Sequence, residues 1–182
     1  MAHVAVTAVG ADRPGIVAAV TGIFVEHGCN LEDSSMTILR GLFTMMLVVD
    51  APAGVGADDL ESALAGAAGE LDLVVSVRPV PEVDIEGAHP SAIGDPWALS
   101  VYGVDRPGIV HGIADLLAGQ GVNITDLSTR VVGDPGRPVY AMLLEVSLPT
   151  GIDPEDLNRR LTATAAELGV DVSFHRSDAD IL

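Results

Sequence analysis

The residues best suited to bind a small molecule lie in one short motif that occurs twice. The sequence DRPGIV stands at residues 12–17 and again at residues 105–110. An aspartate can accept hydrogen bonds from a ligand ammonium group, and an arginine can bind a carboxylate. Each motif therefore carries groups for both ends of an α-amino acid.

Each motif is predicted to begin an α-helix, because apolar residues follow it at helical spacing. The start of a helix presents unpaired backbone N–H groups and the positive end of the helix dipole, where a carboxylate can bind. Pro14 is expected in the first helical turn, where its missing N–H needs no partner. Gly15 and Gly108 are expected to keep the approach to the helix unobstructed.

An asparagine follows each predicted helix, at the point where the chain enters the next strand. A side-chain amide offers donors and an acceptor and therefore suits a zwitterion. Two structural alternatives stay open, because an asparagine in a Gly-x-Asn turn can satisfy local backbone groups and an aspartate near a helix start can be a cap. The predicted ligand-binding residues are Asp12, Arg13, Gly15, Ile16, Asn30, Asp105, Arg106, Gly108, Ile109 and Asn123.

The motif belongs to a tandem duplication, because Gly28 and Gly121, and further along Met45 and Met142, continue the match. In the first copy, alternating apolar residues predict strands over 2–9, 31–39 and 42–49 and from Leu73, and two helical stripes fall between them. Strand, helix, strand, strand, helix, strand is the ferredoxin-like order, with four antiparallel strands and both helices on one face. We predict an α+β chain with domains at 1–80 and 96–182, joined by a linker over 81–95 that is rich in proline and glycine.

The third predicted strand is apolar on both sides, because Thr44, Met46 and Val48 alternate with Phe43, Met45, Leu47 and Val49. A sheet face exposed to water normally carries polar residues. We expect the open faces or the edge strands to pair, either between the two copies or between two chains, and we favour a homodimer.

Composition limits the partners. The chain has 26 acidic residues against nine basic ones, a formal net charge of −17. Nucleic acids and anionic membranes are bound through Lys and Arg, so neither is expected as a partner. Any effect on transcription has to pass through a partner protein.

Neither a metal site nor a catalytic site is predicted. The single cysteine, Cys29, is expected to be a buried small residue, and the five histidines are scattered without metal-ligand spacing. No cofactor is expected. The sequence starts without a signal-peptide pattern and has no long apolar stretch, so the expected compartment is the cytoplasm.

The repeated turn, together with Gly28-Cys29-Asn30 and Gly121-Val122-Asn123, resembles the ACT domain, a small amino-acid-sensing module. In that family, effector amino acids lie at interfaces between paired domains, held by the turn and by the asparagine that begins the second strand. The resemblance assigns those roles to Asp12, Gly15, Asn30, Asp105, Gly108 and Asn123. Some amino-acid-binding members carry a histidine two residues before the turn, where this chain has Gly10 and Gly103.

This chain has two ACT-like domains in tandem, each with the full motif DRPGIV. In this it is similar to the glycine cleavage system transcriptional repressor family, which regulates through protein partners. The resemblance implies a non-catalytic regulatory protein that binds an effector, expected to be an amino acid, and acts on amino-acid metabolism, with glycine or one-carbon metabolism as the narrower expectation. One alternative is an adaptor that binds proteins and no small ligand. Another is a remnant of the regulatory region of formyltetrahydrofolate deformylases, which the motif also resembles.

Overall fold

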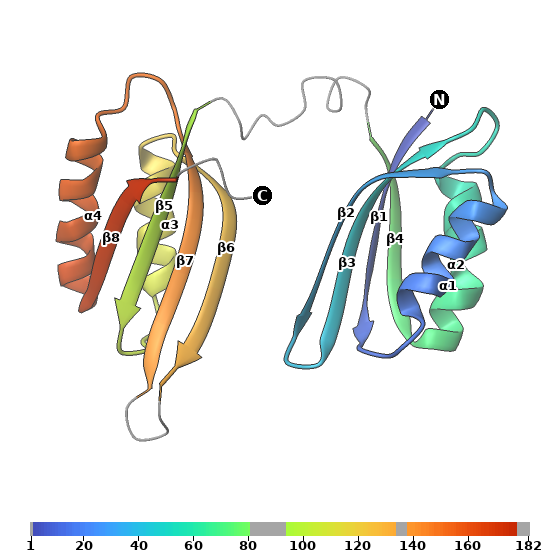
Figure 1. Cartoon of the computed structure of the whole chain (residues 1–182), viewed down its shortest axis with the longest axis horizontal. Helices are drawn as coiled ribbons and strands as arrows, with labels where there is room; N and C mark the ends of the chain where they lie inside the picture. Colours follow the sequence, from blue (N-terminus) through green and yellow to red (C-terminus); the bar gives the residue numbers. More distant parts are fainter. Residues whose placement is uncertain (1, 81–93, 134–137, 178–182) are drawn as a thin grey trace. The chain divides into compact units, whose positions relative to one another are not determined.

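The computed structural model describes residues 2–80, 94–133 and 138–177. The chain divides into two compact units, Met1–Ala88 and His89–Leu182, called unit 1 and unit 2 below (Figure 1). Most of the predicted linker, residues 81–93, lies outside the described residues, and Asp95 already belongs to the first strand of unit 2. The sequence of the second copy has four more residues than the first, Gly133-Asp134-Pro135-Gly136, which are predicted to lengthen a loop and of which only Gly133 lies within the described residues.

Both units have the predicted order of strands and helices, which confirms the α+β, ferredoxin-like fold. Unit 1 contains β1 (Ala2–Ala11), α1 (Ile16–Glu26), β2 (Asn30–Leu39), β3 (Leu42–Ala51), α2 (Ala57–Leu71) and β4 (Leu73–Val80). Unit 2 contains β5 (Asp95–Gly103), α3 (Ile109–Gly119), β6 (Asn123–Val132), β7 (Val139–Leu148), α4 (Pro154–Leu168) and β8 (Val170–Arg176).

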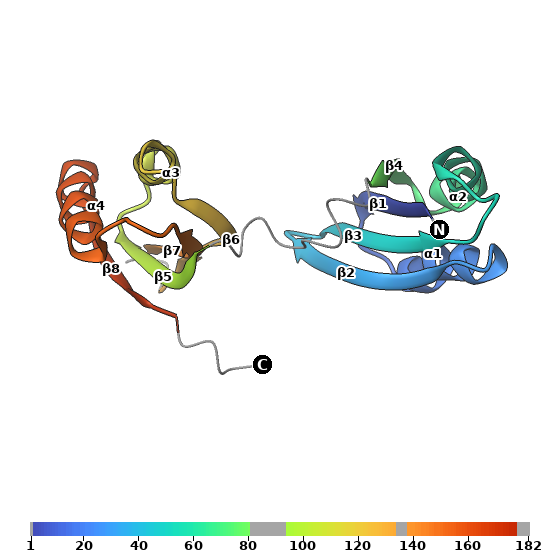
Figure 2. The same cartoon turned by 90° about the horizontal axis from the view of Figure 1, so that it is seen from above.

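Each unit is a two-layer structure with one antiparallel sheet and two helices. The strand orders are β2-β3-β1-β4 and β6-β7-β5-β8. Figure 2 shows α3 and α4 on the same side of the sheet of unit 2. In unit 1, the core packs the apolar stripes of α1 and α2 against alternate residues of the strands, among them Val6, Phe43 and Leu47. The other face of each sheet carries no helix of its own unit and is called the open face below.

The turn between β2 and β3 is a two-residue hairpin at Arg40-Gly41, the two residues between the predicted strands 31–39 and 42–49. Arg40 and Gly41 both have positive φ, 51° and 83°. Two consecutive residues with positive φ match the right-handed twist of the flanking strands. All ten residues of β2 are exposed, because this strand forms the edge of the sheet and the helices contact it little.

The open face of unit 1 is apolar at the end that carries the β2–β3 hairpin, as the alternation predicted. Five large apolar side chains on this face are between 41% and 75% exposed: Val9, Leu39, Leu42, Met46 and Val74. A cluster of this kind is typical of a surface that contacts another molecule. We call these five residues the apolar patch of unit 1.

Candidate functional site

The repeated motif forms the connection between the first strand and the first helix of each unit. Gly15 is the N-cap of α1, with φ 96° and ψ −9°, and Gly108 has φ 98° at the start of α3. A Cβ at either position would meet no atom within 4 Å. That glycine keeps the approach to the helix start unobstructed stays a prediction, and the backbone gives a second reason for glycine. Glycine is needed because this backbone conformation strains any residue with a side chain.

The structure corrects the predicted position of Pro14 and shows that the side chain of Ile16 is buried. Pro14 lies in the turn before α1 and not in its first helical turn. Ile16 begins the helix, but its side chain is 1% exposed and belongs to the core, and Ile109 is equally buried in unit 2. A ligand could contact only the backbone of these two isoleucines.

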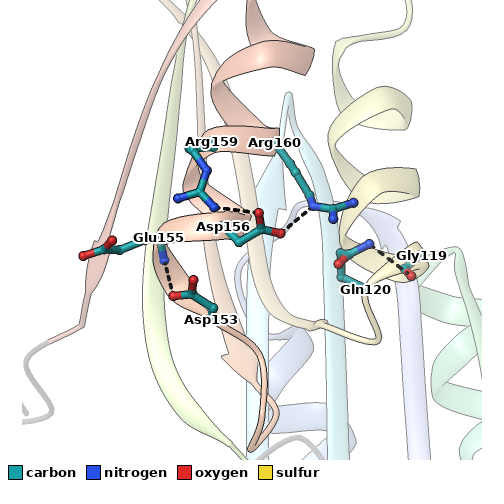
Figure 3. A network of polar contacts seen from close by, with 7 residues as sticks. All are labelled: Gly119, Gln120, Asp153, Glu155, Asp156, Arg159 and Arg160. Carbon is teal, nitrogen blue, oxygen red and sulfur yellow. Dashed lines mark hydrogen bonds and ion pairs between the residues drawn. The ribbon is translucent and has the colours of Figure 1, made fainter.

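The helix starts at the two motifs have free N–H groups, unlike the start of α4. Neither α1 nor α3 has a side-chain cap, and the first helical bond of α1 runs from the N–H of Ala19 to the carbonyl of Gly15. In α4 the carboxylate of Asp153 accepts a hydrogen bond from the N–H of Glu155 at 3.0 Å (Figure 3). In α1 and α3, the backbone N–H groups of the first helical turn are therefore available to an anion, whereas in α4 Asp153 binds one of them.

The polar side chains of the motif are exposed, and one of them has a structural neighbour. The side chains of Asp12, Arg13 and Asp105 all reach solvent, and the N–H of Asp12 donates to the carbonyl of Gly41 at 3.0 Å. The guanidinium of Arg106 lies beside Gly169: a Cβ placed on Gly169 would be 3.1 Å from Nη1 of Arg106. Gly169 is the C-cap of α4, where the helix dipole favours a cation. A structural role for Arg106 therefore competes with carboxylate binding.

One residue near the turn of unit 2 escaped the sequence analysis. Burial, and then the charge of Asp105, raise the pKa of the Tyr140 phenol. Tyr140 pairs with Gly103 across the sheet, at the end of β5 that leads into the motif. The corresponding residue of unit 1 is Phe43, which pairs with Gly10 and has no hydroxyl. The two turns are therefore chemically different.

Gly10 and Gly103, which stand where some ACT domains have histidine, are required by packing. A Cβ at Gly10 would lie 2.6 Å from the backbone oxygen of Asp72, and a Cβ at Gly103 would lie 2.7 Å from the side chain of Val170. The neighbouring strand approaches each glycine too closely for a larger residue. A histidine side chain therefore does not fit at Gly10 or at Gly103.

Asn30 and Asn123 lie far from the turn of their own unit. Asn30 pairs with Asp50, which in turn pairs with His3 near the start of β1, whereas the turn follows Ala11 at the end of β1. Ala11 lies eight residue steps beyond His3 along β1, about 26 Å at the usual rise per residue. In unit 2, Asn123 pairs with Ser147 at the corresponding remote end. The predicted residues thus form two separate groups in each unit.

Asn30 has polar neighbours that the sequence analysis did not group. His3, Asp50 and Asn30 form one row across β1, β3 and β2 on the open face. A β-bulge lies at Glu32, whose Oε2 is 3.2 Å from Nε2 of His3. Within the described residues, Nδ1 of His3 and Oδ1 of Asp50 are buried without a hydrogen-bond partner. We call His3, Asn30, Glu32 and Asp50 the His3 cluster.

Cys29, next to this cluster, is partly buried, and not fully as expected. Burial, and then the charge of Asp50, raise the pKa of its thiol. Across residues 2–80, 94–133 and 138–177, no group of three or more His, Cys, Asp or Glu side chains is placed to hold a metal ion. Over the same residues, no helix is long and apolar enough to cross a membrane.

Comparison with known protein families agrees with this architecture. The pattern of the ACT domain matches residues 2–78 and 98–175, one match in each unit. The chain belongs to the ACT domain family. Both matches contain the repeated turn and the asparagine that begins the second strand of the unit.

Individual relatives place the chain among tandem ACT proteins. The glycine cleavage system transcriptional repressor of Escherichia coli is 27% identical over 95% of this chain and 89% of its own length. A UPF0237 protein of Methanopyrus kandleri is 44% identical over 79 residues, which are 43% of this chain and 88% of that protein. The crystal structure of an unknown protein from Galdieria sulphuraria has a TM-score of 0.80 and 27% identity, covering 97% of this chain and 99% of that one.

Proposed function

We propose that this chain is a non-catalytic, cytoplasmic regulatory protein that binds an amino acid at paired ACT domains and acts through a partner protein. The observation that carries the proposal is the repeated turn, where an uncapped helix start lies next to an exposed aspartate in each unit. The free N–H groups suit the carboxylate of the effector. The net charge of −17 argues for a protein partner and against nucleic acid.

The effector site we propose needs two domains, because the turn and the asparagine of one unit are about 26 Å apart. Asn30 of one domain can meet a turn only when that turn belongs to another domain. We assign the second domain to another copy of the chain, which also gives the apolar patch of unit 1 a surface to contact. The active form is therefore a homodimer.

The regulated process we propose is amino-acid metabolism, and more specifically glycine or one-carbon metabolism. The support for the narrower form is the Escherichia coli relative, a glycine cleavage system transcriptional repressor that aligns with nearly the whole chain. Glycine is therefore the first effector to test.

Thermal unfolding of the full chain with each of the twenty amino acids tests the proposal. A ligand at about a hundred times its Kd adds roughly 2.7 kcal/mol to the free energy of unfolding, which raises Tm by several degrees. We expect a rise confined to one or a few amino acids, and its loss in Asn30→Ala or Asn123→Ala. Sedimentation velocity with the active amino acid should report a dimer, and a monomer there would contradict the two-domain site.

The apolar patch of unit 1 favours one other function, an adaptor that binds a protein without a small ligand. Five large apolar side chains exposed on one sheet face are typical of a surface that contacts another protein. The amino-acid panel separates the two functions, because the Tm of an adaptor does not change with any of the twenty compounds.

A further inference from the structure

We propose that the His3 cluster of unit 1 binds the ammonium group of the effector and that unit 2 has no equivalent site. This inference rests on the proposed amino-acid binding and specifies it further, because it assigns one end of the effector to one unit. It also predicts that the two halves of the duplication have different tasks.

The cluster presents acceptors. Because the carboxylate of Glu32 can only accept, we place a single ring proton of His3 on Nε2, which lies 3.2 Å from Oε2 of Glu32. Nδ1 of His3 then carries a lone pair. Oδ1 of Asp50 is a second acceptor, and the amide oxygen of Asn30, on the neighbouring strand, is a third. An ammonium group has three N–H donors, which matches three acceptors.

Two of these acceptors lack a donor within the described residues. Nδ1 of His3 and Oδ1 of Asp50 are buried and unpaired, and an unpaired buried acceptor destabilises a fold. A ligand that brings N–H donors would remove this cost, and a positive charge would suit the two carboxylates of the cluster. Glu32, whose side chain is 36% exposed, lies at the solvent side, so its movement would open the site.

Unit 2 has an asparagine, Asn123, at the position of Asn30, but none of the other three residues of the cluster. Where unit 1 has His3, Glu32 and Asp50, the corresponding positions of β5, β6 and β7 hold Pro96, Thr125 and Ser147, which have no charge. Ser147 is 7% exposed. Its Oγ would be 2.6 Å from a Cβ placed on Gly94, so the chain that enters unit 2 covers this end of the sheet. Asn123 therefore has no ionised neighbour at its cross-strand position.

The test uses the ring signals of the histidines in ¹⁵N NMR of the full chain, with methylammonium chloride as the probe at constant ionic strength. We expect the signals of His3 to shift with methylammonium and not with acetate, while those of His111 and His175 stay in place. Asp50→Asn, which keeps the shape of the side chain and removes its charge, should weaken methylammonium binding about tenfold or more, since a charged acceptor is replaced by a neutral one. Ser147→Ala, the matched change in unit 2, should leave the binding unchanged.

Several results would overturn this assignment. A His3 ring that carries both protons at neutral pH would leave no acceptor at Nδ1. Methylammonium that leaves the His3 signals unchanged, or that binds Asp50→Asn as well as the original chain, would exclude the cluster as its site. If an amino acid still raises Tm in that case, the proposed effector binding stands and only the ammonium assignment fails. If methylammonium shifts His3 but no amino acid raises Tm, the cluster is an amine site and the proposed function fails.

Discussion

Replacing Gly15 by alanine tests whether the repeated turn depends on a left-handed backbone. The expected loss is about 1–2 kcal/mol of unfolding free energy, the cost of this conformation for a residue with a Cβ. No atom lies within 4 Å of the new methyl group, so packing adds nothing to the cost. In a domain of roughly 60–100 residues each kcal/mol lowers Tm by about 4–8 °C, and the expected drop is therefore about 4–16 °C.

Gly66 offers a matched control in the same unit. It lies inside α2, is exposed, and also has no atom within 4 Å of a new Cβ. Gly66→Ala adds the same methyl group but removes backbone freedom from a helix, so it should stabilise by about 0.5–1 kcal/mol. Both variants are measured by thermal unfolding of the full chain. If Gly15→Ala unfolds at or above the Tm of the original protein, the positive φ at position 15 does not strain a residue with a Cβ, and glycine is not required there.

Two further predictions concern ionisable groups. The charge of Asp50 contributes to the raised pKa of Cys29, so Asp50→Asn should lower that pKa and shift the pH profile of thiol alkylation toward lower pH; an unshifted profile would contradict the contact. Because the folded-state pKa is raised, the stability linked to this thiol is present at neutral pH and is lost as the pH rises through the folded value. A hydrogen bond from Arg160 is the main cause of the lowered pKa of Asp156 (Figure 3), so Arg160→Gln should raise the midpoint of that carboxyl in an NMR titration, and an unchanged midpoint would rule out the pair. The stability linked to this carboxyl is present above its unfolded pKa and is lost as the pH falls through the folded value.

The sequence was sufficient for the fold because its signals are local and occur twice. Alternating apolar residues identified the strands, helical spacing identified the helices, and the duplicated motif gave the same order in both halves. The Arg40-Gly41 hairpin and the apolar open face followed from the same patterns. Each of these features depends on residues that are close together in the sequence, and the spacing of their apolar side chains indicates the element directly.

The candidate site was predicted less well, because it depends on which residues meet across strands. In the sequence only one helix separates Asn30 from the motif, and this spacing does not show how far apart the two lie in the fold. That helix runs back along the sheet and carries the chain to the opposite end, a consequence of the element order that the spacing of residues does not express. The positive φ of Gly15 was not predictable either, since a residue type does not by itself reveal the φ angle that it adopts.

By itself, the sequence determined that this protein is a tandem ACT-type chain with the same turn at the start of two helices. Only the tertiary structure decided that His3, Asp50 and Asn30 form one row, and that the bulge at Glu32 brings a fourth polar side chain to it. The physical reason is strand register. Alternation assigns each residue to a face of the sheet, but the hydrogen bonds between strands decide which residues of that face become neighbours.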